Sequence, residues 1–160
     1  MRKLKLQTQV SVDGFIAGPN GEMDWLTWNW SDDLNQYVTE LTDPVDCILL
    51  GSVLAQGFIP AWEGQLANPE TEDAASAHKM VDTPKIVFSK TLDHLEGQNV
   101  QLEKGDLVEV ITRLKATPGK DLIAYGGSNF VSNLIHHGLI DEYYLFVNPA
   151  AIGCGMTIFK

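Results

Sequence analysis

The sequence has few of the residues that would join it to a nucleic acid or an anionic surface. Lysine and arginine total 11 against 21 aspartates and glutamates, the formal net charge is −10, and Arg2 and Arg113 are the only arginines. An acidic chain repels polyphosphate, which disfavours a nucleic-acid or anionic-membrane partner. A phosphorylated ligand would therefore have to be held locally, by backbone N–H groups and a few lysines.

Cysteine is also scarce. Cys47 and Cys154 are too few for a disulfide framework or a cysteine-based zinc site, and Cys47 lies in an apolar run typical of a small buried residue. The four histidines do not pair with carboxylates at metal-ligating spacing, so no metal site is predicted.

Long apolar segments are absent as well. No run approaches the roughly 20 apolar residues that span a bilayer. The basic start at residues 1–5 is not followed by the apolar stretch of a signal peptide. We therefore expect no membrane partner and a cytoplasmic location.

Strand and helix patterns alternate along the 160 residues, which fit one domain spanning residues 1–160. Because strands alternate with helices, the sequence predicts an α/β fold with a mostly parallel sheet. A short helical turn is expected at Gly51-Ser52, then a loop from residue 59 and a helix near 72–81. Strands are expected at residues 4–12, 45–50, 85–89, 100–102, 122–125 and 140–147, and further helices after Ser31, Asp106 and Gly127.

The run Tyr125-Gly126-Gly127-Ser128 is a candidate phosphate site. Here an expected strand ends in two glycines and a helix begins. Glycines let a pyrophosphate approach the backbone, and the helix dipole favours its charge. In open α/β sheets ligands bind at the carboxyl ends of the strands, where this turn lies. The same glycines could instead serve only a tight turn with a positive φ, and no dinucleotide fingerprint or P-loop lysine accompanies them.

Two other expected strands end in comparable runs, Gly51-Ser52 and Ser89-Lys90-Thr91. If the three strands are neighbours, one extended dinucleotide could touch all three ends. Lys90 is the best-placed cation for a 2′-phosphate, although a solvated surface lysine is the commoner outcome for any single lysine.

A segment rich in tryptophan and aspartate follows the first expected strand. Trp25, Trp28 and Trp30 fall within six positions, too close for all three to be core residues, so some are expected to line a pocket for a planar ring. A carboxylate in such a pocket could hold the N–H groups of a heterocycle and assist its protonation. The alternative role for each carboxylate is helix capping, which is favoured for Asp32.

Taken in order, these segments resemble the dihydrofolate-reductase-like superfamily. They are most similar to the small bacterial proteins that resemble the reductase domain of the riboflavin-biosynthesis deaminase-reductase. The resemblance covers nearly the whole chain. The matching pieces are residues 11–17, 21–26, 48–51, 87–92, 125–128, 134–142 and 149–156.

The resemblance implies a three-layer fold and NADPH-dependent hydride transfer to a pteridine-like (dihydrofolate) or ribosylaminopyrimidine-type substrate, as in riboflavin biosynthesis. It also implies roles for individual residues. The cofactor would lie on Gly51, Ser52, Ser89, Lys90, Thr91, Gly126, Gly127, Ser128 and Asn129, the heterocyclic substrate beside Asp24, Trp25 and Leu26, and the catalytic carboxylates would be Asp33 and Asp13. The proton could come from Asp33, Asp13 or water.

The sequence departs from that family in two ways. Ser52 stands where the family usually has an arginine, which removes a phosphate contact and leaves the preference between NADPH and NADH open. The missing arginine also favours the alternative of a catalytically weak nucleotide-binding or regulatory module on the same fold. The acidic charge and the end of the chain at Lys160 leave open a structural subunit without ligand. Second, the family continues past Phe159 with a final pair of strands. We expect a sheet without that C-terminal hairpin, from either a shortened sequence or an edge covered by the partner in a homodimer.

Overall fold

All six strands of the sheet run parallel, in the order β4-β3-β2-β5-β1-β6. The structure is a computed structural model that describes residues 1–27 and 29–160. The strands are β1 (Leu4–Ser11), β2 (Val45–Gly51), β3 (Lys85–Phe88), β4 (Val100–Glu103), β5 (Asp121–Ala124) and β6 (Glu142–Asn148). The helices are α1 (Asp32–Thr42), α2 (Ser52–Ala67), α3 (Ala74–Asp82), α4 (Leu107–Ala116) and α5 (Ser128–His136).

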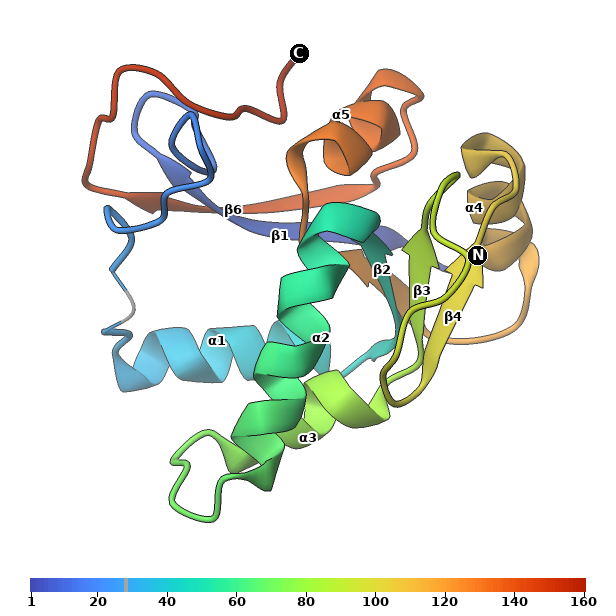
Figure 1. The fold of residues 1–160 in the computed structure, drawn as a ribbon, viewed down its shortest axis with the longest axis horizontal. Helices are drawn as coiled ribbons and strands as arrows, with labels where there is room; N and C mark the ends of the chain where they lie inside the picture. The colour runs from blue at the N-terminus through green and yellow to red at the C-terminus, as the bar shows by residue number, and fades with distance from the viewer. Residues whose placement is uncertain (28) are drawn as a thin grey trace.

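The helices cover both faces of the sheet, with α1, α2 and α3 on one face and α4 and α5 on the other (Figure 1). The core is accordingly divided into two clusters. One contains Ile111 of α4 and Leu134 of α5, and the other contains Ile59 of α2 and Met80 of α3. A strand covered on both faces is apolar along its length, as the continuous run of β2 predicts. The expected three-layer α/β fold with a mostly parallel sheet is confirmed.

The path of the chain reverses between β2 and β5, which are neighbours in the sheet. From β2 the chain passes through α2 and α3 toward β3 and the β4 edge. From β5 it passes through α5 to β6, on the far side of β1. The helices that follow these two adjacent strands therefore leave on opposite faces. Such a switch point is where open α/β sheets bind ligands.

Most helix boundaries follow the local signals in the sequence. Ser31 is the N-cap of α1 and Asp106 is the N-cap of α4, where its carboxylate accepts a hydrogen bond from the backbone N–H of Glu109 at 3.0 Å. Gly138 follows α5 with a φ of +63°, a left-handed conformation that glycine adopts without strain. No helix in the described residues is long and apolar enough to cross a membrane.

The short turn predicted at Gly51-Ser52 is wrong, because α2 runs for 16 residues and includes Pro60. The loop predicted from residue 59 is confined to residues 68–73, and the helix predicted near 72–81 is α3. Tertiary contacts override the low helix propensity of Pro60. Ile59 is buried, and the ring of Phe58 stacks on Tyr125 with centroids 5.5 Å apart.

Two buried lysines hold the carboxyl ends of helices under the sheet. Lys85, 2% exposed, donates from Nζ to the carbonyls of Met80, Val81 and Thr83 at 2.8–2.9 Å. Burial lowers the pKa of Lys85. Lys5 reaches the Leu41 carbonyl at 3.3 Å in the same way. A cation at a helix carboxyl end offsets the negative end of the helix dipole.

Strand β6 forms one edge of the sheet, and no other strand of the described residues lies beyond it. Tyr143, Leu145 and Val147 alternate along it and are 45%, 37% and 60% exposed. The homodimer expected from an open edge stays a prediction.

Gln7 supplies a test of the core. It lies on the face of β1 toward α1, it is 9% exposed, and its Oε1 accepts no hydrogen bond from the described residues. A buried unpaired acceptor costs about 1–3 kcal/mol. We therefore expect Gln7→Met, which keeps the side-chain length, to raise the free energy of unfolding in urea by about 1 kcal/mol.

Gln101→Met, at an exposed position of β4, is the matched control and should change this free energy by less than about 0.5 kcal/mol. A Gln7→Met variant less stable than the wild type would contradict the prediction.

Candidate functional site

The two glycine turns predicted from the sequence touch each other at the switch point. The N–H of Gly51, at the end of β2, donates to the carbonyl of Gly126 at 3.3 Å. A Cβ on Gly51 would lie 2.8 Å from the Cβ of Phe130 in α5, so the approach requires a glycine. The peptide bond between Gly126 and Gly127 is cis. The structure thus brings together the two predicted runs, Gly51-Ser52 and Gly126–Asn129.

These glycines are also the N-cap residues of two helices. Gly51 precedes α2 and Gly127 precedes α5, and no described side chain caps either helix start. By contrast, Asp106 caps α4. The first-turn N–H groups of α2 and α5 therefore have no side-chain acceptor in the described part of the chain. Two helix N-termini at adjacent strand ends favour a negatively charged ligand.

The third predicted run, Ser89-Lys90-Thr91, follows β3, the other neighbour of β2. The Ser89 hydroxyl accepts from the backbone N–H of Thr91 at 3.2 Å. Lys90 is already engaged, because its Nζ donates to the carbonyls of Lys104 and Gly105 at 2.6 and 3.0 Å. The predicted 2′-phosphate contact would have to replace or share these bonds.

Asp13, at the end of β1, is tied to the segment that follows β6. Its carboxylate accepts hydrogen bonds from the Ser11 hydroxyl at 2.6 Å and from the N–H groups of Ile152 and Gly153 at 3.2 and 2.8 Å. These bonds, the one from Ser11 foremost, hold the pKa of Asp13 below its ordinary 3.8. The side chain is therefore ionised at neutral pH and joins two distant parts of the chain.

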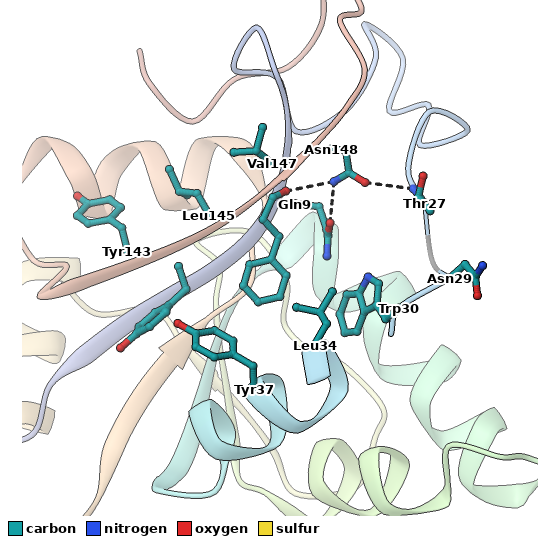
Figure 2. A pocket seen from close by; sticks show the side chains of 12 residues that line it. Gln9, Thr27, Asn29, Trp30, Leu34, Tyr37, Tyr143, Leu145, Val147 and Asn148 are labelled. Atoms are coloured by element: carbon teal, nitrogen blue, oxygen red, sulfur yellow. Dashed lines mark hydrogen bonds between the residues drawn. The ribbon is translucent and has the colours of Figure 1, made fainter. Parts of the chain in front are cut away.

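A cavity of about 570 Å³ lies between α1 and the β1–β6 edge of the sheet (Figure 2). This volume falls within the range of small-molecule sites. The rings of Trp30 and Tyr37 approach the ring of Phe146 with centroids 5.9 and 6.3 Å away. No charged residue lines it among the described residues. The lining residues are Gln9, Thr27, Asn29, Trp30, Leu34, Tyr37, Tyr143, Tyr144, Leu145, Phe146, Val147 and Asn148.

The lining includes a hydrogen-bonded pair of amides, Gln9 and Asn148, that the sequence did not predict. Asn148 is 6% exposed, and its Nδ2 donates to Gln9 Oε1 at 2.7 Å and to the Phe146 carbonyl at 3.1 Å. Its Oδ1 accepts from the N–H of Thr27 at 3.2 Å. Figure 2 shows the Nε2 end of Gln9 turned away from Asn148 and toward the side of Trp30. The only sequence signal was glutamine at alternating positions of a buried strand.

The predicted substrate residues lie beside this cavity rather than in its described lining. Leu26 is buried, the Trp25 indole donates to the Glu22 carbonyl at 3.1 Å, and Asp24 is exposed. Thr27 is the first residue of the segment to line the cavity. Trp28, the second tryptophan of the predicted pocket, lies outside the described residues.

Asp33, the predicted acid, lies in the first turn of α1 and is exposed. Its carboxylate accepts from the Ser31 hydroxyl and from the N–H of Leu34 at 3.0 Å. The bond from Ser31 contributes most to lowering the pKa of Asp33. The neighbouring Leu34 lines the cavity, whereas Asp33 is not among the lining residues.

The sequence matches the RibD C-terminal domain family over residues 2–160, and the chain belongs to that family. The resemblance inferred from the sequence is thereby confirmed. The chain is 33% identical to the uncharacterized protein YyaP of Bacillus subtilis (strain 168), over 99% of this chain and 80% of that protein. It is 21% identical to the riboflavin biosynthesis protein RibD of Corynebacterium ammoniagenes, over 92% of this chain but only 43% of that protein.

Solved structures show the same fold at low identity. A putative riboflavin biosynthesis protein from Shewanella sp. PV-4 gives a TM-score of 0.71 at 24% identity, covering 100% of this chain and 84% of that one. A deaminase and 5-amino-6-(5-phosphoribosylamino)uracil reductase of Thermotoga maritima gives 0.65 at 22%, covering 99% and 48%. Dihydrofolate reductase of Enterococcus faecalis, complexed with NADP(H) and RAB-propyl, gives 0.59 at 18%, covering 99% and 77%.

The Asp13 tether can be tested by hydrogen exchange. Asp13→Asn should speed amide exchange at Ile152 and Gly153, because an amide is a weaker acceptor than a carboxylate. Because the pKa of Asp13 is lowered in the folded protein, its hydrogen bonds to Ile152 and Gly153 are intact above pH 3.8. They weaken as the pH falls through the lowered pKa. Wild-type protection of both amides should therefore persist at pH 3.8.

Asp24→Asn, in the exposed loop before the cavity, is the control and should leave both amides protected. Unchanged exchange in Asp13→Asn would show that Asp13 does not hold the segment.

Proposed function

We propose that the protein is a reductase that uses a nicotinamide dinucleotide, NADPH in preference to NADH, to reduce a heterocycle of pteridine-like (dihydrofolate) or ribosylaminopyrimidine type, as in riboflavin biosynthesis. The observation that carries the proposal is the pair of glycine-capped helices, α2 and α5, at the switch point beside an aromatic cavity. Membership of the RibD C-terminal domain family supports it. So does the fold shared with two proteins described as reductases.

The backbone around the switch point fits the phosphates of such a dinucleotide. The N–H groups of Gly127, Ser128 and Asn129 begin α5 and would hold the pyrophosphate, and Gly51-Ser52 would contact it from α2. Residues 89–91 would hold the rest of the nucleotide. Lys90 would give up its hydrogen bond to the Lys104 carbonyl and bind the 2′-phosphate instead. A bound nicotinamide would supply hydride. Strand β1 lies between β5, whose end carries the phosphate turn, and β6, and it lines the cavity through Gln9. The phosphate turn and the cavity are therefore on neighbouring strands.

The aromatic cavity would orient the substrate ring and exclude water from its faces. Trp30, Tyr37 and Phe146 surround the space in which a planar ring can stack. Asp33 and Asp13 both have lowered pKa values and carry no proton at neutral pH, so we assign proton delivery to water. Asp33 then orders the start of α1, and Asp13 positions the end of β1.

A nucleotide-binding or regulatory module without turnover is the second candidate. It is favoured by one observation, the absence of any acidic or basic side chain in the described lining of the cavity.

The cofactor site is tested by titrating NADPH and NADH against tryptophan fluorescence. We expect saturable quenching of the wild type. Ser128→Asp should weaken binding at least about tenfold, because a carboxylate in the first turn of α5 repels pyrophosphate while favouring the helix. Gly127→Asp should weaken binding for the same reason. It should still fold, because a Cβ at this position has its closest described contact at 4.0 Å.

Ser128→Asn is the matched control, with the same shape but no charge, and should bind within about threefold of wild type. Circular dichroism checks that each variant folds. Absence of saturable quenching by either dinucleotide would overturn both candidate functions.

Turnover separates the two candidates. NADPH absorbance should fall when the protein is mixed with dihydrofolate or with a ribosylaminopyrimidine, at a rate proportional to protein concentration. Ser128→Asp should slow this reaction at subsaturating NADPH, and Ser128→Asn should not. Saturable binding without oxidation of NADPH on either substrate class would favour the module over the enzyme.

A further inference from the structure

The amide pair in the cavity has a defined orientation. The N–H of Thr27 can only donate, so the atom of Asn148 that faces it is the oxygen. Asn148 Nδ2 then faces the Phe146 carbonyl, which can only accept. The atom of Gln9 that meets this nitrogen at 2.7 Å must be its oxygen, Oε1. The backbone groups at both ends of the network therefore fix which atom of each side-chain amide is oxygen and which is nitrogen.

This orientation turns the Gln9 N–H donors toward the cavity. Gln9 lines the cavity, and no described residue accepts a hydrogen bond from its Nε2. An unpaired donor that faces the cavity favours a ligand that brings an acceptor. The hydroxyl of Tyr144 on β6 is already committed to the Glu142 carboxylate at 2.6 Å.

The described lining of the same cavity offers no opposite charge to a cationic ring. Its described lining contains no carboxylate, and a protonated amidine buried there would have no opposite charge. A ring amino group would also place its N–H donors against those of Gln9. A ring carbonyl instead accepts from Gln9 Nε2 and leaves no charge to compensate.

Resting on the proposed function, we propose that Gln9 is the specificity-determining residue of the cavity and that Asn148 is its positioning residue. Gln9 donates to a ring carbonyl, so the cavity selects neutral, lactam-type heterocycles over diamino, amidine-type rings of the same shape that lack this carbonyl. Asn148 keeps the donor face of Gln9 turned inward.

Two pteridines with the same ring test the selection: lumazine, a pteridine dione, and a diaminopteridine. Fluorescence titration in saturating NADPH should show lumazine binding the wild type at least about tenfold more tightly. Gln9→Glu places an acceptor at the same position and should reverse the order. Gln9→Leu removes the donor and should bring the two affinities within about threefold.

Asn148→Asp tests the positioning role with Gln9 intact. An aspartate cannot donate to Gln9 Oε1, so Gln9 turns its amide and presents oxygen to the cavity. We expect the preference for lumazine to fall at least about tenfold. Gln101→Glu repeats the exchange of Gln9→Glu at an exposed position of β4 and should leave the preference unchanged.

The outcomes separate this inference from the proposed function. Equal binding of the two pteridines by the wild type, binding of neither, or an unchanged preference in folded Gln9→Glu overturns the role of Gln9 even if NADPH binds normally. A preference that survives in Asn148→Asp overturns the positioning role. Loss of NADPH binding with the lumazine preference intact overturns the cofactor assignment and supports the role of Gln9.

Discussion

The close approach of Gly51 to the Gly126–Gly127 turn is the contact on which the candidate site depends. It brings the ends of β2 and β5 together backbone to backbone, so that α2 and α5 begin side by side and leave on opposite faces of the sheet. Two helix dipoles then point at one place, and no described side chain caps either helix start. The aromatic cavity lies along the same sheet, at β1 and β6, so the phosphate end and the ring end of a reaction would be held by different strands.

The few cations of this acidic chain are largely used on its own carbonyls. Lys85 and Lys5 hold helix carboxyl ends, Lys115 donates to the Leu139 carbonyl at 2.7 Å, and Lys90 holds the loop between β4 and α4. This use offsets the negative carboxyl ends of helices, such as those that Lys5 and Lys85 reach, in a chain with a net charge of −10. Anion binding at the candidate site then depends on backbone N–H groups, which carry no net charge.

Local signals predicted the features that depend on neighbours in sequence. The alternation of strands and helices, the cap at Asp106 and the glycine turns were all readable because turn and cap chemistry is confined to a few residues. The length of α2 was not, because Phe58 is held by Tyr125, 67 residues later. The pairing of Gln9 with Asn148 joins residues 139 apart and leaves no local pattern. The catalytic roles that the resemblance implies for Asp13 and Asp33 stay predictions, and the proposed function gives both residues positioning roles instead.

The position of β1 has a consequence for how the chain folds. The first strand lies between the last two, paired with β5 on one side and with β6 over seven residue pairs on the other. Contacts of such large sequence separation slow folding, because a long loop must close before they form. During synthesis, β1 cannot pair with β5 and β6 until residues 121–148 have left the ribosome, so its apolar side chains stay unburied until then. We therefore expect slow completion of the sheet and a period in which this strand is exposed to aggregation.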